Sequence, residues 1–207
     1  MKFKYKGQII TAASKVEAVK KIKLSKLDKD DIFNRARDGD KSILKLPPSS
    51  LMIKDKYGQT PIHLFVLSSI TPRKNQLLIL ALPKELLSIK NENGYTPVHQ
   101  LAHRKYKEIL KLSKELLSIK DRYGQTPIHK LAIWKDNDVY NEILALPKEL
   151  LSIKDKEGDT PIHVIIQSEY LDENIRNKIM SLPKELLSIK NKNGQTPLDI
   201  LKHSKSK

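Results

Sequence analysis

Two short sequence phrases, each with a fixed order of apolar and polar residues, occur five times along this chain. The first phrase is LPKELLSIK at 82–90, 146–154 and 182–190, with the variants LSKELLSIK at 112–120 and LPPSSLMIK at 46–54. An isoleucine followed by leucine or methionine stands shortly before each copy, at Ile43, Ile79, Ile109, Ile143 and Ile179. The fixed apolar register around these isoleucines predicts one short amphipathic helix in each repeat.

The second phrase follows the first directly and predicts a turn that leads into a helix. Its copies are DKYGQTPIH, NENGYTPVH, DRYGQTPIH, DKEGDTPIH and NKNGQTPLD, with glycines at 58, 94, 124, 158 and 194. Asp or Asn opens the turn, and glycine takes a backbone conformation that other residues avoid. Threonine caps the helix, and proline occupies its first turn. We therefore expect a first helix after each turn, for example 127–133, and a second helix around each isoleucine.

The two phrases together form an internal repeat. Successive turn glycines are 36, 30, 34 and 36 residues apart, and the length varies only between the end of one turn phrase and the next leucine phrase. A pair of short helices cannot bury both of its faces alone, so neighbouring pairs have to stack into a continuous core. The sequence thus predicts a mainly α protein, built as an α-solenoid.

This repeat resembles the ankyrin repeat, whose mark is a D-x-x-G-x-T-P-L-H turn and helix at a period of about 33 residues. Four copies match through the histidine, and the fifth ends in Pro197-Leu198-Asp199. The resemblance implies an ankyrin-like domain at 27–207. Its parts are a degenerate cap repeat at 28–57, repeats at 58–93, 94–123, 124–157 and 158–193, and a truncated C-terminal repeat at 194–207. It also implies that His63, His99, His129 and His163 support the Thr-Pro turn by hydrogen bonding.

The first residues of the chain follow a different pattern. KFKYK and QIITA flank Lys6 and Gly7, which predicts a β-hairpin. The following SKVE fits a capping box that opens a helix with apolar residues on one face. We predict a small β-β-α module at 1–26, docked on the first repeat.

Composition excludes several classes of function. The chain has 207 residues and no cysteine, which excludes disulfides, thiolate catalysis and cysteine-ligated metals. Five of its seven glycines belong to the turns, Gly39 stands between helices and Gly7 is in the hairpin, so none remains for a phosphate-binding loop. No window approaches the roughly 18 apolar residues of a membrane span.

The remaining candidates for catalysis or metal binding recur in phase with the repeat. Four of the six histidines hold one motif position, and the pair His99 and His103 lacks the glutamate of a zinc-protease motif. Serines and glutamates of the leucine phrase likewise return once per repeat. Because such periodicity is explained by the scaffold, we expect no enzyme activity, no metal, no cofactor and no small-molecule substrate.

The charge of the chain leaves two kinds of partner open. Lys and Arg number 39 against 24 Asp and Glu, a net charge of +15. The lysines form two rows, one ending each leucine phrase and one inside it. A basic stripe could follow a phosphate backbone, but glutamates accompany the second row and few aromatic residues do, which favours a solvated face. Nucleic-acid or nucleoprotein binding, through this surface and the N-terminal module, is the alternative function.

The resemblance implies that partners bind along a concave face, at residues around the turn glycine and at the end of the first helix. The tryptophan and three of the seven tyrosines fall at these positions, and Trp, Tyr and Arg dominate interface hot spots. The alternative is that Trp134 only packs under the loop between the helices. The predicted partner-binding residues are Lys56, Tyr57, Tyr95, His103, Arg104, Arg122, Tyr123, Ile133, Trp134 and Lys156.

We therefore expect a non-enzymatic module that binds another protein, as an effector or inhibitor that occludes its partner. The close identity of the repeats and the Lys-, Ile- and Asn-rich composition are typical of recent duplication in an AT-rich genome, such as that of a bacterium or phage. No membrane association is expected. The expected location is inside the cell, or inside a host cell if the protein is a delivered effector.

Overall fold

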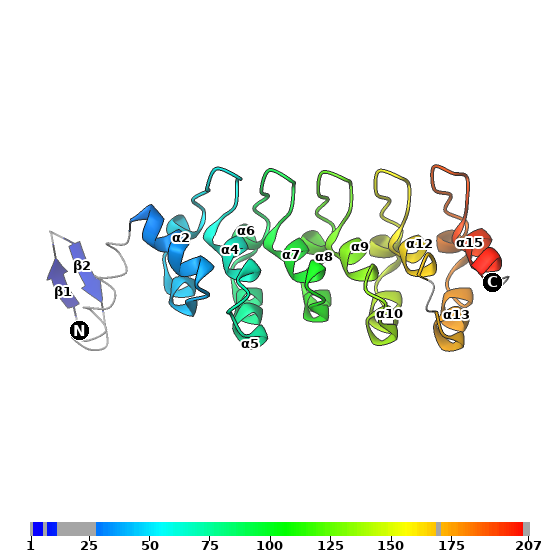
Figure 1. Cartoon of the computed structure of the whole chain (residues 1–207), viewed down its shortest axis with the longest axis horizontal. Helices are drawn as coiled ribbons and strands as arrows, with labels where there is room; N and C mark the ends of the chain where they lie inside the picture. The colour runs from blue at the N-terminus through cyan, green and yellow to red at the C-terminus, as the bar shows by residue number, and fades with distance from the viewer. Residues whose placement is uncertain (1, 6–7, 12–27, 169–170, 205–207) are drawn as a thin grey trace. The chain divides into compact units, whose positions relative to one another are not determined.

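A computed structural model of the chain describes residues 2–5, 8–11, 28–168 and 171–204. Within these residues the protein is mainly α-helical, as the sequence predicts (Figure 1). Its internal contacts group the chain into two compact units, Met1–Gln76 and Leu77–Lys207. This division falls inside the predicted repeat 58–93, and the domain bounds given by the sequence stay a prediction.

The first unit begins with two strands. Strand β1 (Lys2–Tyr5) pairs antiparallel with β2 (Gln8–Thr11), so that Lys2 lies opposite Thr11. The helix expected after them falls in 12–27, outside the described residues, and the β-β-α module therefore stays a prediction. The helical elements of this unit are α2 (Lys29–Arg37), the 3-10 helix η1 (Lys41–Lys45), α3 (Pro48–Leu51), α4 (Pro61–Leu67) and α5 (Arg73–Gln76).

Helix α2 has the polar outer side expected of a cap repeat. The side chain of Asp28 accepts a hydrogen bond from the backbone N–H of Asp31 at 2.8 Å and so begins the helix. Asp30 and Asp31 are exposed, whereas Ile32 and Phe33 are buried. Helix α2 packs against α4.

The second unit repeats one arrangement of helices. Helix α7 packs on α9, α9 on α12, and α12 on α15, while α10 packs on α13. The isoleucines that mark the second helix of each repeat are fully buried between these rows. The elements are η2 (Leu77–Ala81), α6 (Lys84–Leu87), α7 (Pro97–His103), η3 (Lys107–Lys111), α8 (Lys114–Leu117), α9 (Pro127–Ala132), α10 (Asn137–Leu144), α11 (Lys148–Leu151), α12 (Pro161–Ile166), α13 (Glu173–Met180), α14 (Lys184–Leu187) and α15 (Pro197–Ser204).

The prediction of two helices per repeat was wrong, because the leucine phrase forms a third helical segment of its own. The backbone leaves η1 and η3 in an extended conformation, at Leu46 with φ −70° and ψ 154° and at Leu112 with φ −73° and ψ 165°. Proline then follows in most copies and cannot continue the helix before it, but it can begin a new one. Pro83 starts α6 in this way, and Ser113 takes the same backbone conformation before α8.

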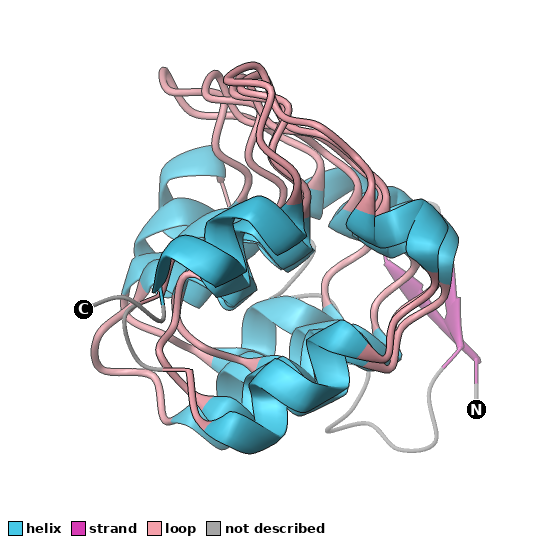
Figure 2. Cartoon of the chain, turned by 90° about the vertical axis from the view of Figure 1, so that its right-hand side faces the viewer, coloured by secondary structure: helices cyan, strands magenta, loops and turns pink. Residues whose placement is uncertain are grey.

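The turns between the leucine phrase and the first helix are built as expected. In the turn before α9, one carboxylate oxygen of Asp121 accepts hydrogen bonds from the backbone N–H groups of Tyr123 and Gln125, at 2.8 and 2.9 Å. Gly124 has φ +75°, a conformation that favours glycine. Figure 2 shows these turns on one side of the helices of the second unit.

Successive turns of the second unit are joined through their backbones. The N–H of Arg122 donates to the carbonyl of Asn93 at 3.1 Å, and the N–H of Lys156 donates to the carbonyl of Tyr123 at 2.9 Å. The N–H of Lys192 likewise donates to the carbonyl of Glu157 in the turn before it, at 2.8 Å. These bonds hold the tips of neighbouring turns in register.

His99, His129 and His163 each link two repeats, and the predicted support of the Thr-Pro turn is confirmed for these three and for His63. Nδ1 of His129 lies 3.2 Å from the backbone nitrogen of Thr126, which can only donate, so Nδ1 is an acceptor. The ring proton is then on Nε2, which donates to the carbonyl of Asp159 in the next turn at 3.1 Å. His99 and His163 make the same two contacts.

Candidate functional site

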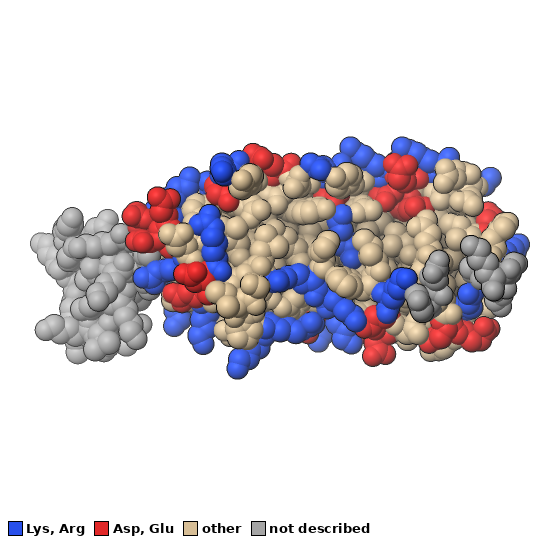
Figure 3. Space-filling view, viewed as in Figure 1, with Lys and Arg blue, Asp and Glu red and all other residues tan. Residues whose placement is uncertain are grey.

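The lysine row that ends the leucine phrases joins repeats of the second unit. Nζ of Lys120 donates to the backbone carbonyl of Lys154 at 2.7 Å, and Nζ of Lys154 donates to that of Lys190 at the same distance. In the row inside the leucine phrases, Nζ of Lys114 lies 3.9 Å from a carboxylate oxygen of Glu149. Figure 3 shows Lys and Arg next to Asp and Glu along the turns. Lysines of both rows therefore have partners within the protein itself.

The predicted partner-binding residues divide between the two units. Lys56 and Tyr57 belong to the first unit, where Nζ of Lys56 lies 5.0 Å from the centre of the Tyr57 ring. Tyr57 is 56% exposed. The other eight predicted residues belong to the second unit.

Tyr123 and Arg122 form a fixed pair at the tip of one turn. Nη2 of Arg122 donates to the hydroxyl of Tyr123, and Nη1 donates to the side-chain oxygen of Asn93 in the preceding turn, both at 2.6 Å. The guanidinium carbon also lies 4.8 Å from the centre of the Tyr123 ring. The hydrogen bond to Tyr123 raises the pKa of Arg122. Tyr123 nevertheless remains 47% exposed, so its ring is both accessible and held in place.

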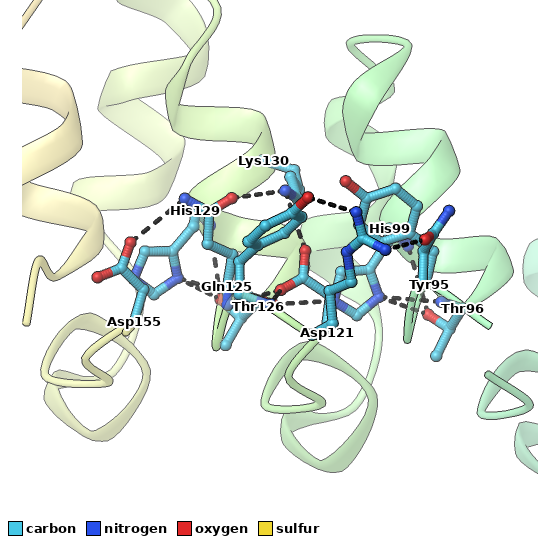
Figure 4. A network of polar contacts seen from close by, with 12 residues as sticks. Tyr95, Thr96, His99, Asp121, Gln125, Thr126, His129, Lys130 and Asp155 are labelled. Atoms are coloured by element: carbon cyan, nitrogen blue, oxygen red, sulfur yellow. Dashed lines mark hydrogen bonds and ion pairs between the residues drawn. The ribbon is translucent and has the colours of Figure 1, made fainter. Parts of the chain in front are cut away.

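A buried lysine that the sequence analysis missed lies beneath this pair. Lys130, on α9, forms an ion pair with the buried carboxylate of Asp121 at 3.0 Å and donates to the side-chain oxygen of Gln125 at 2.5 Å (Figure 4). Its Nζ lies 4.9 Å from the ring centre of Tyr95 and 5.6 Å from that of Tyr123. Cations at such distances attract the faces of aromatic rings. Lys130 thus connects the two tyrosines of neighbouring turns.

One signal in the sequence could have singled out this lysine. The residue after the motif histidine is Leu64, Gln100 or Val164 in the other repeats, and Ile200 follows Asp199 in the last. A charged residue at a position that is otherwise apolar or neutral requires a buried partner. Asp121 supplies that partner.

Tyr95 is backed by a neutral histidine. Its ring stacks on that of His99, with centroids 5.9 Å apart and an angle of 20° between the planes. Burial lowers the pKa of His99 to about 4, although the carbonyl of Gln125 and the charge of Asp121 act in the opposite direction. The imidazole therefore carries no charge at neutral pH. It acts as a support for Tyr95 and for the turn.

A second group of exposed side chains lies at the ends of the first helices. Nε1 of Trp134 donates to the carbonyl of Ala102 in the preceding repeat at 3.0 Å, and the ring of His103 meets it edge-on at 6.5 Å between centroids. Trp134 is 37% exposed and Ile133 is 55% exposed. The tryptophan thus packs on its neighbour and also presents part of its ring to the outside.

The remaining predicted residues lie at the same turns and helix ends. Arg104 caps the end of α7 and is half-buried. Lys156 is exposed at the tip that follows Tyr123, where its backbone N–H holds that turn. The next residue after Arg104, Lys105, pairs with Asp136 at 2.7 Å and lowers the pKa of that carboxyl. We call Tyr95, His103, Arg104, Arg122, Tyr123, Ile133 and Trp134 the aromatic surface, with Lys130 as a buried support of its two tyrosines.

Two other kinds of site are absent from the described part of the protein. No three His, Asp or Glu side chains come together there in a group that could hold a metal ion. Among the helices of residues 28–168 and 171–204, none combines the length and the apolar content needed to cross a bilayer.

Comparisons with known proteins give the fold. No family model matches the chain, and no curated protein matches it. Among solved structures, it is similar to a chain of the Bd0816 predatory endopeptidase from Bdellovibrio bacteriovorus in complex with the immunity protein Bd3460. The TM-score is 0.57, the sequence identity is 21%, and the match covers 84% of this chain and 91% of that chain. A likeness at this identity is a likeness of fold.

Proposed function

We propose that this chain is an ankyrin-type repeat protein that binds another protein through the aromatic surface, without enzyme activity of its own. The observation that carries the proposal is that Tyr123 and Trp134 are exposed and yet fixed by hydrogen bonds, to Arg122 and to Ala102 respectively. Large rings held in one position lose little freedom on binding, which favours affinity.

The role of an inhibitor that occludes its partner is the finer part of the proposal. It is supported by the solved complex to which this chain is similar, because that complex contains an endopeptidase and an immunity protein. By analogy, the partner of this chain is itself an enzyme whose working surface the aromatic surface covers. The contacts of Lys130 with Tyr95 and Tyr123 would keep the surface preorganised for that partner.

The test is affinity capture with quantitative mass spectrometry, using the full-length protein, the double variant Tyr123→Ala/Trp134→Ala and a control. Met180→Ala is the matched control, because Met180 is 47% exposed on α13 and lies outside the aromatic surface. We expect a protein captured by the wild type and by the control to be lost with the double variant. In a titration of that protein, the double variant should weaken binding by about 30-fold or more, the size of a hot spot.

Binding of nucleic acid is the competing function, and the net charge of +15 is the observation that favours it. Much of that charge lies in residues 1–27, which hold eight lysines and one glutamate. A nucleic-acid complex should lose affinity steeply as salt rises, by several powers of ten between about 50 and 200 mM. A complex held by the aromatic surface should change little over this range, so a salt titration of the captured complex separates the two functions.

A further inference from the structure

Two turns of the second unit carry the same Asn-Gly pair, Asn93–Gly94 and Asn193–Gly194. Asn-Gly sequences are prone to deamidation, because glycine has no Cβ to keep its backbone nitrogen away from the side-chain amide of the asparagine. The two glycines have almost the same conformation, with φ +76° and +74°. The N–H of Gly94 donates to the backbone carbonyl of Asn91 at 2.9 Å, and the N–H of Gly194 donates to that of Asn191 at 3.0 Å. The local geometry of the pairs is therefore alike.

The next turn of the protein holds the first pair in place. The backbone carbonyl of Asn93 accepts from the N–H of Arg122 at 3.1 Å, and its side-chain oxygen accepts from Nη1 of Arg122 at 2.6 Å. The backbone at Gly94 is also closely packed, since a Cβ added there would lie 2.7 Å from the backbone nitrogen of Arg122. The side-chain amide can turn toward the glycine nitrogen only after these contacts open.

The second pair belongs to the last turn that the structure describes. Both asparagines are exposed, but Gly194 is exposed whereas Gly94 is half-buried. A Cβ added at Gly194 would have no described atom within 4 Å. Among the described residues, no turn follows that could supply the contacts which Arg122 makes with Asn93.

We propose that Asn193 is a site of spontaneous deamidation and that Arg122 protects Asn93 from the same reaction. The backbone nitrogen of Gly194 loses its proton to solvent and attacks Cγ of Asn193. The new C–N bond closes a succinimide, and the bond from Cγ to the amide nitrogen breaks as that nitrogen takes up a proton and leaves as ammonia. Water then opens the ring at either carbonyl and gives aspartate or isoaspartate, so the turn gains a negative charge.

The test follows both sites in one sample of the full-length protein. The protein is incubated at neutral pH and physiological temperature, and peptide mapping by mass spectrometry measures aspartate plus isoaspartate at each position over time. Because Asn93 reacts only after two hydrogen bonds open, we expect Asn193 to deamidate at least about tenfold faster. Equal rates, or faster reaction at Asn93, would overturn the proposal.

Two further measurements assign the difference to the contact. In Arg122→Ala, which loses the side-chain hydrogen bond, the rate at Asn93 should rise by about threefold to tenfold and the rate at Asn193 should stay unchanged. In the denatured protein the two rates should converge. A difference in rate that persists in denaturant would come from the neighbours in sequence, Glu92 and Lys192. An unchanged rate of deamidation at Asn93 in the variant would show that Arg122 does not protect this residue. Either result contradicts the proposal.

Discussion

The internal turns of the second unit and its last described turn have nearly the same sequence but different surroundings. An internal turn ends in a histidine such as His129, which accepts from Thr126 and donates to the carbonyl of Asp159 in the next repeat. In the last turn Asp199 takes this position. It accepts from the backbone N–H of Thr196 at 2.9 Å and from the hydroxyl at 2.7 Å.

The comparison separates two tasks that one histidine performs. Support of the threonine cap requires only an acceptor, which either residue provides. The link to a following repeat requires a donor as well, and a carboxylate has none at neutral pH. The exchange of histidine for aspartate therefore occurs where the described part of the protein has no following turn to be linked.

The largest effect should come from pH, which acts on the buried histidines of the internal turns. Burial lowers the pKa of His99 from 6.5 to about 4, and it lowers those of His129 and His163. Between pH 6.5 and 4 the unfolded protein binds protons that the folded protein does not, so stability falls as the pH falls. His99 alone should account for a loss of about 3 kcal/mol by the lower end of this range, measured by urea unfolding at a series of pH values.

The last turn should not contribute to this loss. Hydrogen bonds from Thr196 lower the pKa of Asp199 below its usual 3.8, so this carboxylate keeps its charge throughout the window. A His99→Gln variant, which keeps an acceptor and a donor without a proton to gain, should have a flatter dependence on pH. If it follows the wild-type curve, the buried neutral His99 is not the origin of the effect.

A smaller contrast is expected from the turn glycines. Gly124 and Gly194 have φ +75° and +74°, so alanine at either position costs about 1 kcal/mol in backbone strain. At Gly124 the new Cβ would also lie 2.9 Å from the backbone nitrogen of Lys156. We expect Gly124→Ala to lose about 2–4 kcal/mol in all, against about 1 kcal/mol for Gly194→Ala, in denaturant unfolding. Equal losses would mean that the packing of successive turns carries little energy.

Local rules in the sequence predicted the turns and the first helices correctly. The Asp or Asn that opens a turn, its glycine and the Thr-Pro helix start act through neighbours within a few residues, so their outcome can be derived without the fold. The third helical segment was missed although the proline before α6 signals it, because the second helix was expected only around each isoleucine. The second segments differ in their helix starts: the side chain of Asp136 caps the α-helix α10, whereas the 3-10 helix η3 begins after Tyr106 without a side-chain cap.

The aromatic surface was only partly predictable. Tyr123 and Trp134 follow from their repeat positions. The role of Lys130 depends on Asp121 and Tyr123 of its own turn and on Tyr95 of the preceding turn, and the two tyrosines meet only when the repeats stack. A position that varies between repeats can thus belong to the core or to the surface, and its neighbours in space decide which.

The smallest contrast concerns the lysine row. Lys154 donates to the carbonyl of Lys190 at 2.7 Å, whereas Lys190 has no equivalent carbonyl after it among the described residues. Lys154→Met should therefore lose about 0.5–1 kcal/mol in denaturant unfolding, and Lys190→Met should stay within about 0.3 kcal/mol of the wild type. Both variants keep most of the aliphatic part of the residue and remove one positive charge, so a general effect of net charge would appear equally in both. A greater loss at Lys190 than at Lys154 would mean that the hydrogen bond between repeats does not stabilise the fold.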